Sequence, residues 1–387
     1  MPRNRLAQRI HDVPPSGIRR FFDIAAQMQD VVSLGIGEPD FVTPAHIRDA
    51  AIDSIRAGKT AYTSNSGLLE LRQAIATHIR MHTGVQYDPE EEILVTVGVS
   101  EALQQAMLAL INPGDEVIIP EPCFVAYPAC VVFAGGTPVM VPTHAANDFA
   151  VDPAAIAAAI TPRTKAILIG YPNNPTGAVI DVTAMQSIVD IAHQHELVLL
   201  SDEIYDRLVY GTPHVSAVSA RDARDITVLM GGFSKAYAMT GWRLGWLAAP
   251  ADICGAVRKV HQYGIMSAPT AAQYAGLAAL RHGEADVQTM VHEYDKRRQV
   301  LVAGLRRIGL PTHEPKGAFY VFPQVGHLGL SSSEFCERLL QESHVAIIPG
   351  DVFGPSGAGY ARLCYAASMH HIETALERIE QFVQRIT

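Results

Sequence analysis

Short runs of branched apolar residues alternate with helical patterns through the middle of this chain. Each run ends in glycine, proline or polar residues, as buried strands of a parallel sheet do. The runs are Ile93–Val97, Glu116–Ile119, Ala166–Ile169, Leu197–Leu200 and Ile226–Met230. The helical patterns include Ser100–Ile111, Pro153–Ile160 and Thr183–His195. This alternation predicts an α/β layered domain with a mostly parallel sheet covered on both faces.

The pattern changes after about Arg281. The elements expected there are a long helix over Glu284–Ile308, the stretch Gly317–Phe322, a helix over Ser333–Glu342, a short strand near Val345–Ile348 and a closing helix from Ile372. This order is typical of a smaller α+β domain. No repeat, low-complexity tract or flexible linker is present, so we expect two domains that share an interface where a ligand can bind.

The composition and charge of the chain limit the classes of molecule that it is expected to bind. The chain has 387 residues, of which 48% are hydrophobic, and a net charge of −9 without acidic or basic runs. That balance disfavours nucleic acid or an anionic membrane as the main partner and favours a small molecule. The five cysteines include no CxxC pair, so neither a disulfide framework nor a zinc knuckle is expected. No apolar stretch approaches the length of a membrane span, and we expect a cytoplasmic protein.

Candidate ligand-binding residues follow the ends of the predicted strands, where open α/β sheets bind their ligands. Gly98-Val99-Ser100 opens a helix and suits a phosphate, although Ser100 capping its own helix is the commoner role. The prolines and the glycine of the segment 171–177 fix a loop that aims the Asn174 amide, although an ordinary Asn-Pro turn would have the same sequence.

Two further strand ends carry ionisable groups. Asp202 follows a buried apolar strand and needs a cationic partner, which a protonated pyridine nitrogen or a protein arginine would provide. Lys235 lies among small and aromatic residues, with Arg243 eight positions later. A lone lysine is usually a solvated surface charge, but its neighbours Phe233 and Trp242 form a poor solvent face. Together these groups match what pyridoxal phosphate (PLP) requires: an amine for its aldehyde, an acid for its ring nitrogen and ligands for its phosphate.

These motifs resemble the class I/II aminotransferases of PLP fold type I. The resemblance spans nearly the whole chain, from the segment 34–41 (LGIGEPDF) to the segment 360–363 (YARL), and is most specific at Ser234–Gly245 and at the segment 174–177 (NPTG). It implies a large domain with a mostly parallel seven-stranded sheet plus a smaller α+β domain. The implied boundaries are residues 1–45 for an N-terminal arm and part of the small domain, 46–283 for the large PLP-binding domain and 284–387 for the small C-terminal domain.

The resemblance assigns roles around the cofactor ring. It implies that Lys235 forms the Schiff base, that Asp202 pairs with the pyridine nitrogen, and that Tyr205 and Asn174 bond the ring hydroxyl. Phe124 is expected to stack on the ring face. Lys235 would then act as general base and acid at the substrate Cα in a ping-pong reaction between an amino acid and a 2-oxo acid.

It also assigns the phosphate and the substrate carboxylate. Arg243, Ser100 and the Val99 N–H are expected at the phosphate, while Gly37 and Arg362 receive the α-carboxylate, with Asn174 nearby. Tyr62 resembles the tyrosine that reaches into the neighbouring subunit's site, which implies a homodimer.

One position departs from the family pattern. Many members carry a hydroxyl residue three positions before the lysine, where this chain has Gly232, and Ser234 is the residue that would compensate. The motif Ser16-Gly17-Ile18-Arg19 and others look closest to the bacterial and archaeal aspartate/aromatic-type group, which includes the N-acetyl-diaminopimelate aminotransferases. The substrate does not follow from that subgroup.

Other functions remain open at this point. A PLP-dependent β-lyase would use the same scaffold. A non-catalytic regulator domain would need a DNA-binding module, for which the ~30 residues before Val31 are too few. No GxGxxG follows the early strands, which disfavours a nicotinamide dehydrogenase. The spacing of His193, His195 and Glu196, and of His370 and His371, does not suit a zinc helix, so no metal is expected.

Overall fold

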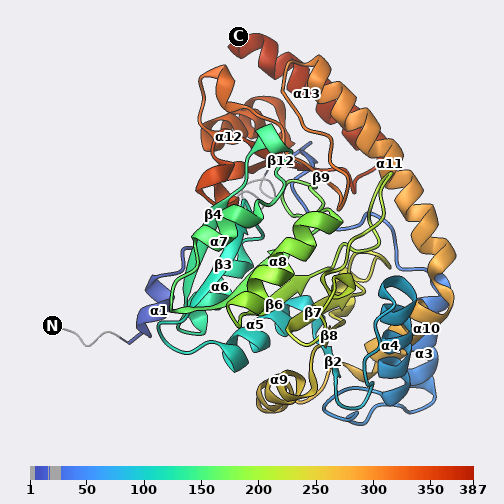
Figure 1. The fold of residues 1–387 in the computed structure, drawn as a ribbon. Helices are drawn as coiled ribbons and strands as arrows, with labels where there is room; N and C mark the ends of the chain where they lie inside the picture. Colours follow the sequence, from blue (N-terminus) through green and yellow to red (C-terminus); the bar gives the residue numbers. More distant parts are fainter. Residues whose placement is uncertain (1–4, 16, 18–27) are drawn as a thin grey trace.

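The computed structural model describes residues 5–15, 17 and 28–387, and it is built around a seven-stranded sheet with the order β2-β8-β7-β6-β5-β3-β4 (Figure 1). Its strands are β2 (Ile93–Thr96), β3 (Glu116–Glu121), β4 (Thr137–Pro142), β5 (Thr164–Gly170), β6 (Val198–Asp202), β7 (Thr227–Gly232) and β8 (Gly245–Ala248). Only the two pairings of β8 are antiparallel among the pairings of this sheet. The predicted α/β fold with a mostly parallel sheet is confirmed.

Helices cover both faces of this sheet. One face packs on α5 (Gly98–Leu110), α6 (Ala126–Phe133) and α9 (Ala251–Gly264), and the other on α7 (Pro153–Ala158) and α8 (Val182–Gln194). Along β5, Ala166 and Leu168 belong to the first core, while Ile167 and Ile169 belong to the second. Because side chains alternate along a strand, a strand with apolar residues at every position needs helices on both sides.

Three more helices close the end of the sheet near β2. They are α3 (Ala45–Arg56), α4 (Leu69–Thr83) and α10 (Thr270–His282), and they share a core with Ile93 and Val95 of β2. Before α3, the described chain contains α1 (Gln8–His11) and the short strand β1 (Val32–Ser33). Gly37, four residues after β1, lies next to the sheet, because its carbonyl oxygen accepts a hydrogen bond from Lys235 Nζ.

The chain after Gly283 forms a second group of elements across the top and along the right side of Figure 1. Its helices are α11 (Glu284–Arg307), α12 (Ser332–Ser343) and α13 (Met369–Ile386), and its strands are β9 (Tyr320–Val321), β10 (Val345–Ala346), β11 (Ile348–Pro349) and β12 (Ala361–Cys364). Strands β11, β12 and β9 form an antiparallel sheet, and β10 pairs in parallel with β1. The single strand predicted near Val345–Ile348 is therefore wrong in detail, because the chain passes there from one sheet to another.

One helix boundary also differs from the expectation. Helix α5 begins at Gly98 rather than at Ser100. Gly98 has φ +75°, a left-handed conformation that glycine adopts without a steric penalty, and it lets the strand turn directly into the helix. The motif Ser16-Gly17-Ile18-Arg19 lies, apart from Gly17, outside the described residues.

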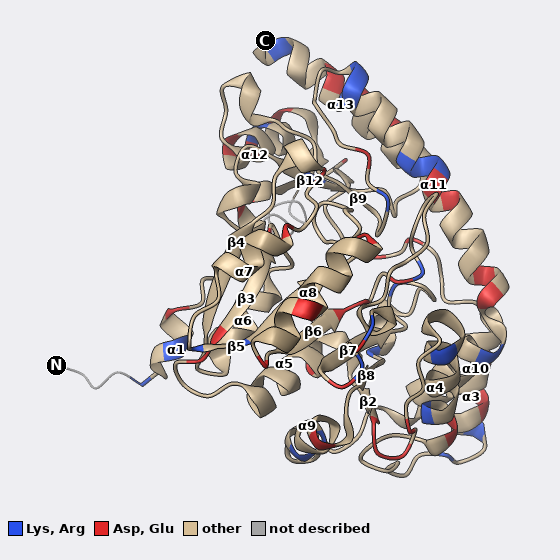
Figure 2. Ribbon diagram, viewed as in Figure 1, with Lys and Arg blue, Asp and Glu red and all other residues tan. Residues whose placement is uncertain are grey.

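Charges of both signs are interspersed on the outer helices, whereas the strands of the central sheet are nearly free of them (Figure 2). Within the described part of the chain, none of the helices combines the length and the apolar character that crossing a membrane requires.

Candidate active site

A pocket of about 270 Å³ opens at the C-terminal ends of β2, β3, β5, β6 and β7. Of the predicted site residues, it is lined by Gly37, Val99, Ser100, Phe124, Asn174, Asp202, Tyr205, Ser234, Lys235, Arg243 and Arg362. Because parallel strands end at the same edge of the sheet, residues that are far apart in the sequence meet here. The structure therefore brings together every predicted site residue except Tyr62.

Asp202 ends β6 at the floor of the pocket and is only 6% exposed. Its Oδ2 accepts a hydrogen bond from the Tyr127 hydroxyl at 2.8 Å, and its Oδ1 accepts one from the Ile204 N–H at 3.2 Å. Burial raises the pKa of Asp202 to about 6, against the lowering effect of these donors. In the described residues no arginine or lysine forms an ion pair with it, so the protein arginine considered from the sequence is not found there, and a cationic group of a ligand would suit this carboxylate.

Lys235 lies in the turn after β7 and lines the same pocket as Asp202. Its Nζ donates a hydrogen bond to Gly37 O at 2.6 Å and lies 5.6 Å from the centre of the Phe319 ring. Burial lowers the pKa of Lys235 from 10.5 to about 8. A lysine with this pKa is partly neutral near physiological pH and is able to act as a nucleophile or a base.

The N-terminus of α5 forms one end of the pocket. No side chain caps this helix, so the first N–H groups are open to a ligand. A Cβ on Gly98 would lie 2.8 Å from Arg243 Nη2, and one on Gly245 would lie 2.7 Å from the Val99 nitrogen. Gly98 thus leaves room for the Arg243 guanidinium beside the helix end, and Gly245 lets the first turn of α5 pack closely against β8. Backbone donors, the Ser100 hydroxyl and an arginine together form an anion cradle.

Arg362, on β12, forms the opposite end and is 2% exposed. Its Nη1 donates to Asn174 Oδ1 at 2.8 Å and its Nη2 to Gly35 O at 2.7 Å, while its Nε is buried without a partner. The guanidinium lies 4.5 Å from the centre of the Tyr320 ring and 4.8 Å from that of Phe353. A guanidinium held between two rings at the edge of a pocket suits a ligand carboxylate.

A pair of tyrosines connects the two ends. The hydroxyls of Tyr205 and Tyr320 are 2.8 Å apart, and burial raises the pKa of both groups. Gly37 lies beside them, where a Cβ would approach the Tyr320 hydroxyl to 2.2 Å. Only glycine therefore fits at Gly37.

Tyr62 and Gly232 differ from the other positions considered from the sequence, because neither lines the pocket. Tyr62 is 83% exposed and does not line the pocket of its own chain. At Gly232, the departure from the family pattern, a Cβ would lie 3.1 Å from Ile204 Cδ1 and 3.2 Å from the Leu244 oxygen. The backbone is thus too close for a larger residue without a shift, whereas Ser234 does line the pocket.

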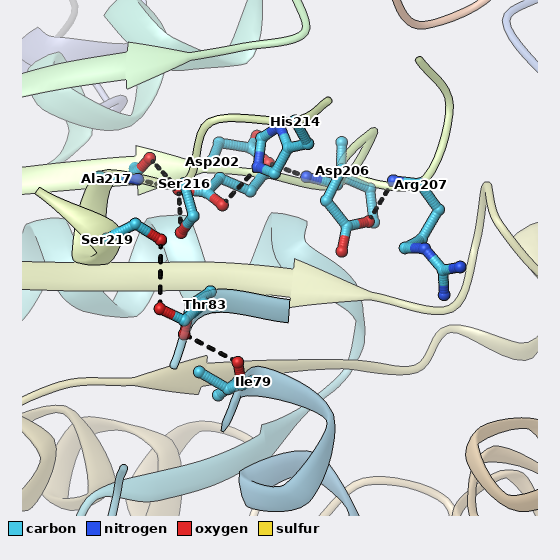
Figure 3. Close-up of polar contacts among 12 residues, drawn as sticks. Ile79, Thr83, Asp202, Asp206, Arg207, His214, Ser216, Ala217 and Ser219 are labelled. Carbon is cyan, nitrogen blue, oxygen red and sulfur yellow. Dashed lines mark hydrogen bonds and ion pairs between the residues drawn. The ribbon is translucent and has the colours of Figure 1, made fainter. Parts of the chain in front are cut away.

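Glu203, which follows Asp202 in the sequence, has a structural role outside the first pocket. Glu203 points into a separate cavity of about 340 Å³. Its carboxylate contacts the Ser201 and Ser216 hydroxyls, the Ala217 N–H and the His214 ring. Figure 3 shows His214, Ser216 and Ala217 gathered beside the end of β6. Glu203 therefore anchors the loop that follows, and Asp202 alone of the two acids faces the first pocket.

Sequence reasoning missed two tyrosines of the pocket, Tyr127 and Tyr320. Tyr127 comes three residues after Phe124, and its ring lies 5.7 Å from the Phe124 ring, so the spacing was a usable signal. Tyr320 comes from the strand β9, and nothing in its local sequence places it beside Tyr205.

The pocket fits PLP by its own chemistry. The cradle that a Cβ on Gly98 or Gly245 would fill suits the phosphate, and the buried Asp202 without a protein cation suits the ring nitrogen. Lys235 with its lowered pKa suits the aldehyde, and the orphaned Nε of Arg362 suits a substrate carboxylate. These groups are the ones that this cofactor requires of a protein.

Known proteins resemble the chain over nearly its full length. The family model for aminotransferases of class I and II matches residues 29–379. The aspartate aminotransferase of Pyrococcus abyssi is 43% identical, covering 98% of both chains, and the aromatic-amino-acid aminotransferase 2 of Thermococcus litoralis is 41% identical, also covering 98% of both. The solved structure of the Thermus thermophilus aspartate aminotransferase with maleate has a TM-score of 0.94 at 39% identity, covering 98% of this chain and 100% of that one.

Proposed function

We propose how this chain works from the premise that it belongs to the class I and II aminotransferases, the PLP-dependent enzymes that transfer amino groups. The donor is an L-amino acid and the acceptor a 2-oxo acid. The observation that carries the assignment of this reaction to the pocket is that Lys235, Asp202 and Arg362 all line the same 270 Å³. Amine, acid and carboxylate receptor are thereby within reach of one small ligand.

Within this pocket, the residues of the protein would hold the cofactor at its phosphate, its ring nitrogen, its ring face and its ring hydroxyl. The α5 N-terminus, Ser100 and Arg243 bind its phosphate, and Asp202 pairs with its ring nitrogen. Phe124 stacks on the ring, and Tyr205 and Asn174 bond the ring hydroxyl. The Asn174 oxygen already accepts from Arg362, which leaves the Asn174 amide N–H groups free to donate.

The chemistry is divided between cofactor and protein. When bound, PLP supplies an aldehyde carbon that reacts with amines and a ring that accepts electron density from the substrate Cα. Lys235 Nζ removes the proton from the substrate Cα and later returns a proton to the ligand. Its pKa of about 8 suits both directions near neutral pH, because the donor and acceptor forms are then both populated. Asp202, which is shielded from water, would balance the positive charge of a protonated ring nitrogen.

Arg362 and Gly37 receive the substrate α-carboxylate. The two rings around Arg362 and its bond to Gly35 O fix the guanidinium, so little motion has to be lost when the carboxylate binds. The relatives are named for aspartate and for aromatic amino acids. We therefore propose L-amino acids of these two classes as the first donors to test, together with acylated diamino acids.

We further propose that the enzyme is a cytoplasmic homodimer with shared active sites. Tyr62 is 83% exposed and, together with the exposed Val42, Tyr263 and Met266, leaves large apolar side chains on the surface. An obligate interface of this kind would bury about 2,000 Å² or more in total. The division into a large unit over residues 46–283 and a small unit over 284–387, with 1–45 as an arm, is part of this proposal.

A half-reaction screen tests the function. Purified holoenzyme is mixed with single amino acids, and the absorbance of the bound cofactor is followed. An aminotransferase converts one equivalent of donor and stops until an oxo acid is added, whereas a β-lyase continues and releases pyruvate and ammonia. Borohydride reduction followed by peptide mapping identifies the lysine that binds the cofactor. Label on a lysine other than Lys235 would overturn the site assignment.

A further inference from the structure

The shorter of the two hydrogen bonds to the Asp202 carboxylate comes from Tyr127, a residue to which no role has been assigned so far. Tyr127, in the first turn of α6, is 5% exposed, and its hydroxyl donates to Asp202 Oδ2 at 2.8 Å. The Ile204 N–H occupies the other carboxylate oxygen. Since an ionised carboxylate accepts about four hydrogen bonds, these two donors fix its orientation and leave acceptor positions for a ligand.

The backbone makes room for this hydroxyl at one glycine. Gly170 ends β5 and is the direct neighbour of Asp202 across the parallel pair β5–β6. A Cβ on Gly170 would lie 2.2 Å from the Tyr127 hydroxyl oxygen and 2.9 Å from its Cζ. Its φ is not in the left-handed region, so the backbone there would accept alanine. The space for the Tyr127 ring, and not the backbone conformation, explains the glycine.

The hydrogen bond made by Tyr127 and the space left by Gly170 come from different elements, α6 and β5. Both concern the same atom, the hydroxyl oxygen of Tyr127. We propose that Tyr127 and Gly170 form a positioning pair for the reaction: the Tyr127 hydroxyl holds the Asp202 carboxylate toward the ring nitrogen of the cofactor, and Gly170 leaves the space for that hydroxyl. The proposal rests on the function proposed above.

The pair has an electrostatic consequence. Burial favours the protonated form of Asp202, and the Tyr127 donor opposes that effect. Without the donor, the proton shared between the carboxylate and the ring nitrogen moves toward the carboxylate. Tyr127 itself stays protonated, because burial and the neighbouring Asp202 raise its pKa well above the ordinary range. It therefore acts only as a donor.

Two variants test the pair from its two sides, Tyr127→Phe and Gly170→Ala. Tyr87→Phe is the control for the first, because Tyr87 is 4% exposed and its hydroxyl has no hydrogen-bond partner among the described residues. Gly255→Ala is the control for the second, because a Cβ on Gly255 has nothing within 4 Å. Thermal unfolding of all variants checks that they fold.

The main readout is solid-state ¹⁵N NMR of holoenzyme loaded with ring-¹⁵N-labelled cofactor. In both test variants the ring resonance should move toward that of an unprotonated pyridine, and the cofactor dissociation constant should rise about tenfold, the loss expected for one hydrogen bond to a charged group. The double variant should lose little more than either single one, because both act on the same contact. The two control variants should leave both readouts unchanged.

The outcomes separate this inference from the proposed function. If Asp202→Asn changes the ring resonance while Tyr127→Phe and Gly170→Ala leave the resonance and the cofactor affinity as in the wild type, the positioning pair is wrong and the site assignment stands. If wild-type protein binds the cofactor at another lysine, the proposed function fails first. Losses in Tyr127→Phe and Gly170→Ala that simply add would also overturn the pair.

Discussion

Replacing Lys235 by methionine should stabilise the cofactor-free protein while abolishing catalysis. Lys235 carries its charge inside a pocket, and burial lowers its pKa from 10.5 to about 8. That difference corresponds to about 3 kcal/mol of unfavourable free energy for the charged form in the folded state. Methionine has a similar length and no charge. Lys235→Met should therefore raise the free energy of unfolding at pH 7 by up to about 3 kcal/mol.

The pH dependence identifies the cause. The folded protein binds this proton more weakly than the unfolded chain, so the penalty is complete below about pH 8 and disappears as the pH rises to 10.5. The gain from Lys235→Met should thus fall to about 2 kcal/mol at pH 9 and below about 1 kcal/mol at pH 10. Loss of the bond to Gly37 O subtracts little, because Gly37 is only partly buried and water can replace the donor.

Urea unfolding of the cofactor-free variants at pH 7, 9 and 10 measures the effect. Lys59→Met is the matched control, because Lys59 is exposed and its replacement should change the free energy of unfolding by less than about 0.5 kcal/mol at every pH. A Lys235→Met protein that is less stable than the wild type at pH 7, or a gain that is the same at pH 7 and pH 10, would refute the reasoning.

Three further predictions concern the loaded enzyme. Asp202→Asn should slow the half-reaction by about 10²-fold or more, because it removes a preorganised charge partner, and a rate near that of the wild type would contradict this role. Arg362→Lys should raise KM by about tenfold with a smaller effect on kcat, since lysine lacks the planar fork that binds a carboxylate, and an unchanged KM would place the carboxylate elsewhere. Mixing Tyr62→Phe with Lys235→Ala should restore part of the activity, because one site of the mixed dimer then receives neither substitution. No recovery after subunit exchange confirmed by mass would mean that Tyr62 serves its own chain.

The parallel strands were predictable because they are buried on both faces and therefore consist of consecutive apolar residues. Strand β5, for example, is predicted as Ala166–Ile169 and observed as Thr164–Gly170. A strand between two helical layers has to be apolar at every position, and the run of branched residues records that requirement. Several site residues could be located for the same reason, because Ser100, Asn174, Asp202 and Lys235 follow such runs, whereas Gly37, Tyr62, Phe124 and Arg362 were expected only from the family resemblance.

Two strands of the central sheet gave no such signal. Strand β8 reads Gly245-Trp246-Leu247-Ala248, without a single β-branched residue. Strand β4 begins and ends next to prolines, at Pro138 and Pro142, which argue against a strand by local preference. At the edge of the sheet, where β4 lies, proline is tolerated because one side of the strand has no partner. Position at the edge of the sheet therefore explains why β4 forms despite its prolines.

The contacts of Asp202 could not be predicted for a different reason. The sequence shows that Asp202 needs a partner, yet it does not show that the helix after β3 brings a tyrosine to it, 75 residues away in the chain. That contact depends on the position of α6 relative to β6. Many packed side chains together determine this position. Local sequence patterns predict helices and strands. They do not predict how these helices and strands pack, and this packing determines which hydroxyl group bonds to the Asp202 carboxylate.

Lys235 and Asp202 share one physical feature: each is buried in the pocket, and neither forms an ion pair with another of the residues that the structure describes. Burial raises the pKa of the acid and lowers that of the amine, so folding alone favours the neutral form of both. A ligand with a protonated ring nitrogen opposite Asp202 and an aldehyde within reach of Lys235 removes both penalties at once. Binding that relieves strain in the folded state stabilises that state by mass action. The same two groups that make the cofactor-free pocket costly therefore make its affinity specific for a cofactor with that pair of functions.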